Sequence, residues 1–130
     1  INSKRLQLWD NYYQGLKELE EEGRIELPYI PDECCHNAHM FYIKVKDLDE
    51  RTKLIQYLSE CDIKAVFHYV PLHSSKAGKQ NGDFVGNDKY TTRESERLLR
   101  LPMFYSLENE GVEYVVEKII EFYLAKRNRR

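Results

Sequence analysis

Two histidines and a tyrosine follow a predicted strand in the stretch AVFHYVPLHSSKAG, residues 65–78. His68 and Tyr69 come directly after its apolar residues, and His73 comes after Pro71, which restricts the backbone. A neutral imidazole can donate one hydrogen bond and accept another, and a tyrosine offers a hydroxyl group and a flat ring. These side chains are therefore candidates for a metal site, a phosphate-binding loop or a catalytic site. The remaining alternative is local packing.

A metal site is the first of these alternatives, because imidazole and thiolate groups are zinc ligands. His36 and His39 stand three residues apart, and Cys34 and Cys35 precede them directly. Their spacing matches no zinc signature, and neighbouring residues of a strand point to opposite faces. We therefore expect no metal site in this chain.

A phosphate site is the second alternative, because SSKAGK, residues 74–79, combines small residues with lysines. The stretch lacks the G-x-x-x-x-G-K-[ST] order of a nucleotide-binding P-loop, so solvated loop residues are the better interpretation. The sequence also has no Ser-His-Asp or Cys-His signature and no glycine-rich dinucleotide fingerprint. From the residues alone, packing at a strand end explains His68 and Tyr69 as well as chemistry does.

The composition indicates one ordered domain. The chain has 130 residues, of which 42% are hydrophobic and 32% charged. Its net charge of −2, with basic and acidic residues interleaved, argues against a nucleic-acid-binding surface. Basic residues cluster only in the tail, residues 126–130, where they suit the negative end of a predicted helix.

The location and extent of the protein can also be predicted. No run approaches the roughly 18 apolar residues of a membrane-spanning helix, and no signal-peptide pattern is present. The three cysteines, two of them adjacent, favour a reducing compartment, so we expect a cytoplasmic protein. Since the chain starts at Ile1 without an initiator methionine, we expect it to be part of a longer polypeptide.

The spacing of the apolar residues predicts a two-layer α/β sandwich of the α+β kind, with helices covering a small sheet. We expect helices near residues 6–19, 47–61, 91–99 and 112–123, and strands near residues 39–45, 63–69 and 100–104. Asp47 and Asp49 are candidate N-caps of the second helix. The first helix carries Trp9, Tyr12 and Tyr13, and we expect this aromatic surface to remain uncovered until it meets a partner.

The segment between the second and third strands is the least regular part of the prediction. Residues 70–90 show no helix or strand pattern, and loops beyond about 12–15 residues are usually functional or mobile. Thr91 and Glu94 have the spacing of a capping box, which predicts that a helix begins there and includes Leu98 and Leu99.

Four stretches together resemble the small C-terminal domain of nucleotide-sugar aminotransferases of the DegT/DnrJ/EryC1/StrS family: RLQLWDNYYQGL, NAHMFYIKV, AVFHYVPLH and KYTTRESERLLRLPMFY. The resemblance implies a fold-type-I, pyridoxal-phosphate-dependent homodimer that transfers an amino group from L-glutamate to a dTDP-linked keto-sugar. In that family a large N-terminal domain supplies the Schiff-base lysine and most cofactor contacts. None of those motifs occurs here, so the resemblance implies no catalytic or cofactor-binding residue in this chain.

The resemblance also gives the first residues a chemical role. It implies that His68, Tyr69 and His73 bind the amino donor or the sugar, that the chain packs on its own N-terminal large domain, and that neither nucleic acid nor membrane is a partner. Asn37 and His39 match an N-x-H pattern before the strand, with a structural role. One departure is Lys76, where related sequences often have proline. A rival interpretation is a noncatalytic binding or sensor module that retains only this domain.

Overall fold

The computed structural model describes residues 2–127 and contains a small antiparallel sheet with strand order β1-β3-β2. The strands are β1 (Phe41–Lys44), β2 (Val66–Phe67) and β3 (Leu98–Leu101). The helices are α1 (Asn2–Glu21), α2 (Leu48–Glu60), the 3-10 turn η1 (Leu72–Ser74), α3 (Lys76–Asn81), α4 (Thr91–Arg97) and α5 (Asn109–Arg127). Residues 128–130 of the basic tail lie outside the described residues.

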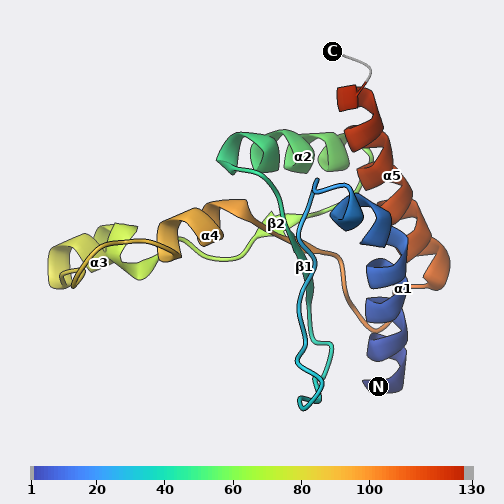
Figure 1. The fold of residues 1–130 in the computed structure, drawn as a ribbon, viewed down its shortest axis with the longest axis horizontal. Helices are drawn as coiled ribbons and strands as arrows, with labels where there is room; N and C mark the ends of the chain where they lie inside the picture. Colours follow the sequence, from blue (N-terminus) through green and yellow to red (C-terminus); the bar gives the residue numbers. More distant parts are fainter. Residues whose placement is uncertain (1, 128–130) are drawn as a thin grey trace.

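One face of the sheet forms the hydrophobic core with the helices. Phe41 is paired with Leu101, and Ile43 with Leu99, and all four side chains are buried. The alternation predicted for the first strand is confirmed, because Tyr42 and Lys44 on the other face are only half-buried. The predicted two-layer arrangement is confirmed too: α1 and α5 lie side by side in Figure 1 and cover this core.

The first helix packs closely against the last. Leu8, Tyr12 and Leu16 follow helical spacing and are buried. A Cβ atom at Gly15 would lie 2.9 Å from Val116 Cγ1, so this glycine allows α1 to approach α5. Gly23, with a φ of +74°, ends the helical segment in the left-handed conformation that glycine adopts without strain.

The expectation of an uncovered aromatic surface on this helix was wrong. Trp9 is only 8% exposed and Tyr12 is fully buried. Their rings pack on Phe41 with centroid distances of 5.3 and 5.0 Å, and the Tyr12 hydroxyl donates a hydrogen bond of 2.6 Å to Pro102 O. Burial raises the pKa of Tyr12. The sheet of this chain therefore covers the surface that we had assigned to a partner.

The second helix begins as predicted at one of its two candidate caps. Asp47 is the N-cap, and its Oδ1 accepts a hydrogen bond of 2.9 Å from the backbone N–H of Glu50. Leu54 and Leu58 are buried on its inner face. No helix within residues 2–127 is both long enough and apolar enough to cross a lipid bilayer.

The boundary between the third predicted helix and the third predicted strand was wrong by two residues. Leu98 and Leu99 belong to β3, because pairing with β1 buries Leu99 completely, and this outweighs local helix propensity. The strand ends at Leu101 because Pro102 has no N–H to donate to a neighbouring strand. The predicted capping box is also absent: the N-cap is Tyr90, without a side-chain capping bond.

Residues 68–92 form an extension that we call the arm. Its chain leaves the sheet after β2 and returns through α4 to β3, and Figure 1 shows α3 and α4 reaching away from the paired helices α1 and α5. The expectation of a segment without helices was wrong, because η1 and α3 lie within it. Ser75 caps α3 by accepting a hydrogen bond of 2.9 Å from Gly78 N, a local signal in SSKAG that we had interpreted only as a loop.

Candidate functional site

His68 and Tyr69 lie together at the base of the arm. They directly follow β2, which is paired with β3 through Phe67 and Leu99. The two rings meet at a centroid distance of 4.4 Å and an angle of 63°. His68 is half-buried, whereas Tyr69 is 70% exposed, so the pair offers one sheltered imidazole beside an accessible phenol.

The imidazole of His68 has an unused polar atom. Its Nδ1 is buried and has no hydrogen-bond partner within residues 2–127. A buried polar atom without a partner costs about 1–3 kcal/mol, and such atoms are few in native proteins. His68 Nδ1 therefore lacks a hydrogen-bond partner, which the described residues do not supply.

His73 belongs to a second group of side chains, which we call the clasp: His73, Asp88 and Thr92. His73 Nε2 lies 2.9 Å from Asp88 Oδ2, and the backbone N–H of Thr92 donates to Asp88 Oδ1 at 3.2 Å. The Thr92 hydroxyl also donates to Asp88 Oδ2. The three predicted residues thus fall into two groups, with His68 beside Tyr69 and His73 bonded to Asp88.

Asp88 was missed by the sequence analysis. Hydrogen bonds from the Thr92 side chain and backbone, followed by the bond with His73, lower its pKa below the ordinary value. The available signal was an aspartate shortly before a predicted helix, since Asp is a preferred capping residue. We instead assigned the cap to Thr91, which shares the same short polar character.

The SSKAGK stretch closes on itself. Ser75 Oγ accepts from Gly78 N and donates to Leu72 O at 2.7 Å. A Cβ atom at Gly78 would lie 1.6 Å from Leu72 O, so glycine is required by close packing of the chain on itself. The Ser75 hydroxyl and the Gly78 N–H are therefore already bonded within the segment. Lys76 is the first residue of α3, a position where proline is also favoured, so its departure from the family pattern needs no different backbone.

The residues predicted as possible metal ligands have other contacts or are exposed. Cys34 and Cys35 are exposed free thiols, and the His36 ring packs on Trp9 at 4.6 Å. His39 Nδ1 lies 2.9 Å from Asn37 Oδ1. Within the part of the chain that the structure describes, no three His, Cys, Asp or Glu side chains gather to hold a metal ion.

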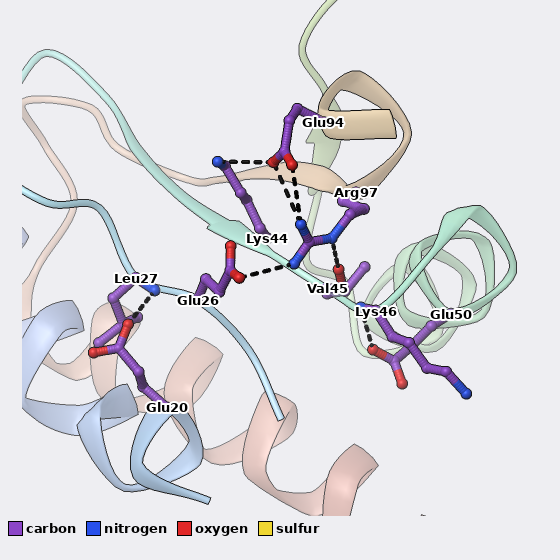
Figure 2. Close-up of polar contacts among 9 residues, drawn as sticks. All are labelled: Glu20, Glu26, Leu27, Lys44, Val45, Lys46, Glu50, Glu94 and Arg97. Atoms are coloured by element: carbon purple, nitrogen blue, oxygen red, sulfur yellow. Dashed lines mark hydrogen bonds and ion pairs between the residues drawn. The ribbon is translucent and has the colours of Figure 1, made fainter. Parts of the chain in front are cut away.

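A wide groove lies elsewhere and is lined mainly by charged residues. It has a volume of about 1380 Å³, and His68, Tyr69 and His73 are not among its lining residues. We define the Arg97 cluster by the residues Glu26, Lys44, Val45, Glu94 and Arg97 (Figure 2), all of which except Glu94 line this groove. Since none of the candidate residues lines this groove, we judge its role from the contacts among its own side chains.

The Arg97 cluster satisfies its own charges. Arg97 Nε donates to Val45 O at 2.7 Å, and its terminal nitrogens pair with Glu26 and Glu94 at 3.2 Å each. Lys44 Nζ pairs with Glu94 at 2.8 Å, and this lysine is the main reason why the pKa of Glu94 is lowered. The cluster joins β1, α4 and the segment before β1, and we interpret it as structural.

Glu50 is a second polar feature that the sequence did not reveal. Its side chain is buried and accepts hydrogen bonds from Lys46 N at 2.9 Å, Tyr123 Oη at 3.1 Å and Lys126 Nζ at 2.6 Å. Burial, followed by the charge of Glu50, raises the pKa of Tyr123. These bonds hold α2 against α5.

Comparison with known proteins supplies the context for these sites. A family model described as the DegT/DnrJ/EryC1/StrS aminotransferase family matches residues 1–120. A "Pleiotropic regulatory protein" of Geobacillus stearothermophilus is 33% identical over 106 residues, which cover 81% of this chain and 28% of that protein. A "dTDP-3-amino-3,4,6-trideoxy-alpha-D-glucose transaminase" of Micromonospora megalomicea subsp. nigra is 30% identical over 112 residues, or 85% of this chain and 29% of that protein.

Solved structures agree on the fold. The aminotransferase TlmJ of Streptoalloteichus hindustanus matches 97% of this chain with a TM-score of 0.82 and 21% identity, over 32% of its own length. DesV of S. venezuelae, solved in complex with a ketimine intermediate, matches 93% of this chain with a TM-score of 0.81 and 25% identity, over 31% of its length. The predicted fold class, that of the small domain of fold-type-I aminotransferases, is confirmed, and the chain spans less than a third of these proteins.

Proposed function

Since this chain belongs to the DegT/DnrJ/EryC1/StrS aminotransferase family, we propose that it is the small C-terminal domain of a pyridoxal-phosphate-dependent sugar aminotransferase. The full-length enzyme would transfer an amino group from L-glutamate to a dTDP-4-keto-6-deoxyhexose, the activity of a dTDP-4-amino-4,6-dideoxygalactose transaminase. We place this reaction in the cytoplasm, in the supply of amino sugars for bacterial surface polysaccharides.

The observation that carries this proposal within the chain is the His68 and Tyr69 pair. An exposed phenol beside a sheltered imidazole, with Nδ1 unpartnered among the described residues, suits the hydroxyl groups of a sugar or the carboxylate of glutamate. The named relatives include transaminases for dTDP-linked amino sugars, which supports the nucleotide-sugar class. Both of these relatives are named for 3-amino sugars, so they do not support the 4-keto position. We infer that position from the four resembling stretches alone.

The cofactor, in our proposal, is held by residues outside this chain. The one stretch that resembles a phosphate-binding loop is filled by the bonds of Ser75 and by the contact of Gly78 with Leu72 O. Pyridoxal phosphate supplies the electron sink for amino transfer when it is bound. We therefore assign its Schiff-base lysine and phosphate contacts to the large domain, on which this chain would pack within a homodimer.

A direct test uses the full-length protein encoded with this chain. Purified enzyme would be incubated with L-glutamate and dTDP-4-keto-6-deoxyglucose, and the aminated sugar nucleotide and 2-oxoglutarate would be quantified. Equal amounts of both products would support the proposal. Amination of a 3-keto isomer alone would refute the 4-keto assignment, and absence of transfer to any nucleotide-linked keto-sugar would refute the function.

A second candidate is a noncatalytic regulatory or sensor module. It is favoured by the relative named as a pleiotropic regulatory protein, which is 33% identical to this chain. The gene sequence distinguishes the two candidates. A large N-terminal domain with a Schiff-base lysine supports the enzyme, and a gene that encodes no such domain supports the module.

A further inference from the structure

The base of the arm is fixed at two places. On one side, Val66 and Phe67 of β2 pair with Arg100 and Leu99 of β3. On the other side, the clasp links His73, at the start of the arm, to Asp88 and Thr92, at its end. Because α4 leads directly into β3, the clasp and the strand pairing each connect the outgoing chain of the arm to its returning chain.

The hydrogen bonds of the clasp define the state of the imidazole. An ionised carboxylate only accepts hydrogen bonds, so His73 must carry a hydrogen on Nε2 to bond with Asp88 Oδ2 at 2.9 Å. The lowered pKa of Asp88, caused first by Thr92, favours this ionised form. The Phe84 ring lies 4.3 Å from the His73 ring and restricts its orientation.

Residues 68–72 lie between these two fixed places. Tyr69 is 70% exposed, so the position of its hydroxyl depends mainly on where the backbone runs. That backbone enters η1 through a turn in which Ser74 N and Ser75 N donate to Pro71 O at 3.0 and 3.1 Å. His73 lies within this turn, so a bond from its side chain anchors the end of the segment that carries His68 and Tyr69.

We propose that His73 is a positioning residue for His68 and Tyr69, and that it acts through its bond to Asp88 without touching the substrate. This role rests on the proposed function, and it replaces direct substrate binding as our assignment for His73. Such a residue affects how well the keto-sugar is held more than how fast the amino group is transferred. Its contribution should therefore be seen in KM.

The test compares His73→Leu with His73→Gln in the full-length enzyme. Leucine keeps an apolar contact for Phe84 but cannot bond to Asp88, whereas the glutamine amide can donate from nearly the position of Nε2. We expect His73→Leu to raise KM for the keto-sugar about five- to tenfold, with kcat changed less than twofold. His73→Gln should restore KM to within about twofold of the wild type.

Two further measurements separate positioning from simple folding effects. His39→Leu is the matched control, because His39 makes a bond of similar length, 2.9 Å to Asn37, in a different loop. Its KM should equal that of the wild type. Hydrogen exchange at residues 68–72 should be faster in His73→Leu than in the wild type or His73→Gln, with the melting temperature changed by less than about 2 °C.

Three results would overturn this role. An unchanged KM in His73→Leu, with active wild-type enzyme, refutes positioning even if exchange is faster. A loss of kcat that His73→Gln fails to restore indicates direct contact with the reacting groups. If the wild type transfers no amino group to any keto-sugar, the proposed function itself has failed, and the substrate role of the clasp fails with it.

Discussion

The Arg97 cluster and the arm use polar residues in opposite ways. In the Arg97 cluster the cation bonds to Val45 O, Glu26 and Glu94, and the Arg97 side chain is only 11% exposed. In the arm, the largest apolar side chains remain exposed, and His68 Nδ1 has no partner among the described residues. One region is complete within this chain, and the other is not.

This difference, and not the size of a groove, is the basis for our proposal that the base of the arm binds the substrate. In the groove beside the Arg97 cluster, Lys44 and Arg97 are already engaged in ion pairs with Glu94 and Glu26. The base of the arm differs in this respect. Tyr69 is exposed, and the buried Nδ1 of His68 has no hydrogen bond to lose among the described residues.

The most severe test of this contrast is the chain by itself. If the arm is one side of an active site whose other side lies elsewhere, residues 1–130 alone should fold but show no transaminase activity. Added pyridoxal phosphate should give no stoichiometric aldimine band in an absorbance spectrum. Specific and saturable labelling of one lysine of this chain would contradict the expectation.

The largest effect on stability should come from the Arg97 cluster. Replacing Arg97 by Met removes the guanidinium and leaves Val45 O, Glu26 and Glu94 without their shared partner. We expect the free energy of unfolding to fall by about 2–3 kcal/mol, somewhat below the loss for a fully buried pair because Glu26 is 58% exposed. Urea denaturation of the wild type and the Arg97→Met variant measures this change in the free energy of unfolding.

Arg93 provides the matched control for that substitution. It lies one turn earlier on α4 and is exposed, so Arg93→Met should change the free energy of unfolding by less than about 0.5 kcal/mol. If both variants lose the same stability, the effect comes from the charge or the helix. The completed bonds of the Arg97 cluster would then not be its cause.

The arm should show the reverse pattern, with activity changed and stability spared. In the full-length enzyme, His68→Ala should lower kcat/KM by about ten- to a hundredfold, the effect of losing one hydrogen bond to a charged or polar substrate group. Its melting temperature should stay near that of the wild type, because His68 is half-buried at a strand end. Measuring the two half-reactions separately would show whether the donor or the sugar loses the contact. Normal rates in both would return His68 to a packing role.

The sequence predicted most of the fold because periodic burial is a local property. The faces of the first, second and last helices and the alternation of Phe41 and Ile43 followed from residue spacing alone. The errors arose where distant contacts decided the outcome. Leu99 joins a strand because β1 buries it, and Trp9 is covered because the sheet reaches it.

The candidate site was predictable only in part for the same reason. His68, Tyr69 and His73 were proposed from their types and from the family resemblance, but Asp88 lies fifteen residues from His73 and only folding joins them. The buried position of Glu50 depends on Tyr123 and Lys126, which are even more distant in the sequence. Residue types identify candidates, and the fold decides which of them are already bonded.

The smallest expected effect is on the pH dependence of stability at acidic pH, where the Arg97 cluster and the arm should again differ. The pKa of Glu94 is lowered chiefly by Lys44, and that of Asp88 chiefly by Thr92. A carboxyl group whose pKa is lower in the folded state stabilises the fold above its unfolded pKa of about 4, and this contribution is lost as the pH falls through the folded pKa. The contribution of each carboxyl group to the free energy of unfolding should therefore be smallest at pH values below its lowered pKa.

The two carboxyl groups should nevertheless give different acid responses when they are removed. Glu94→Gln should make the global stability of the chain less dependent on pH between about 5 and 3, because the Arg97 cluster joins β1 to α4. Asp88→Asn should leave that global slope nearly unchanged and should speed hydrogen exchange only within residues 68–92, because Asp88 bonds to His73 and Thr92 inside the arm. Urea denaturation across this pH range, with exchange measured on the same variants, makes the comparison. If Asp88→Asn flattened the global slope as much as Glu94→Gln does, the arm would be an integral part of the cooperative fold, and the contrast between the two regions would be wrong.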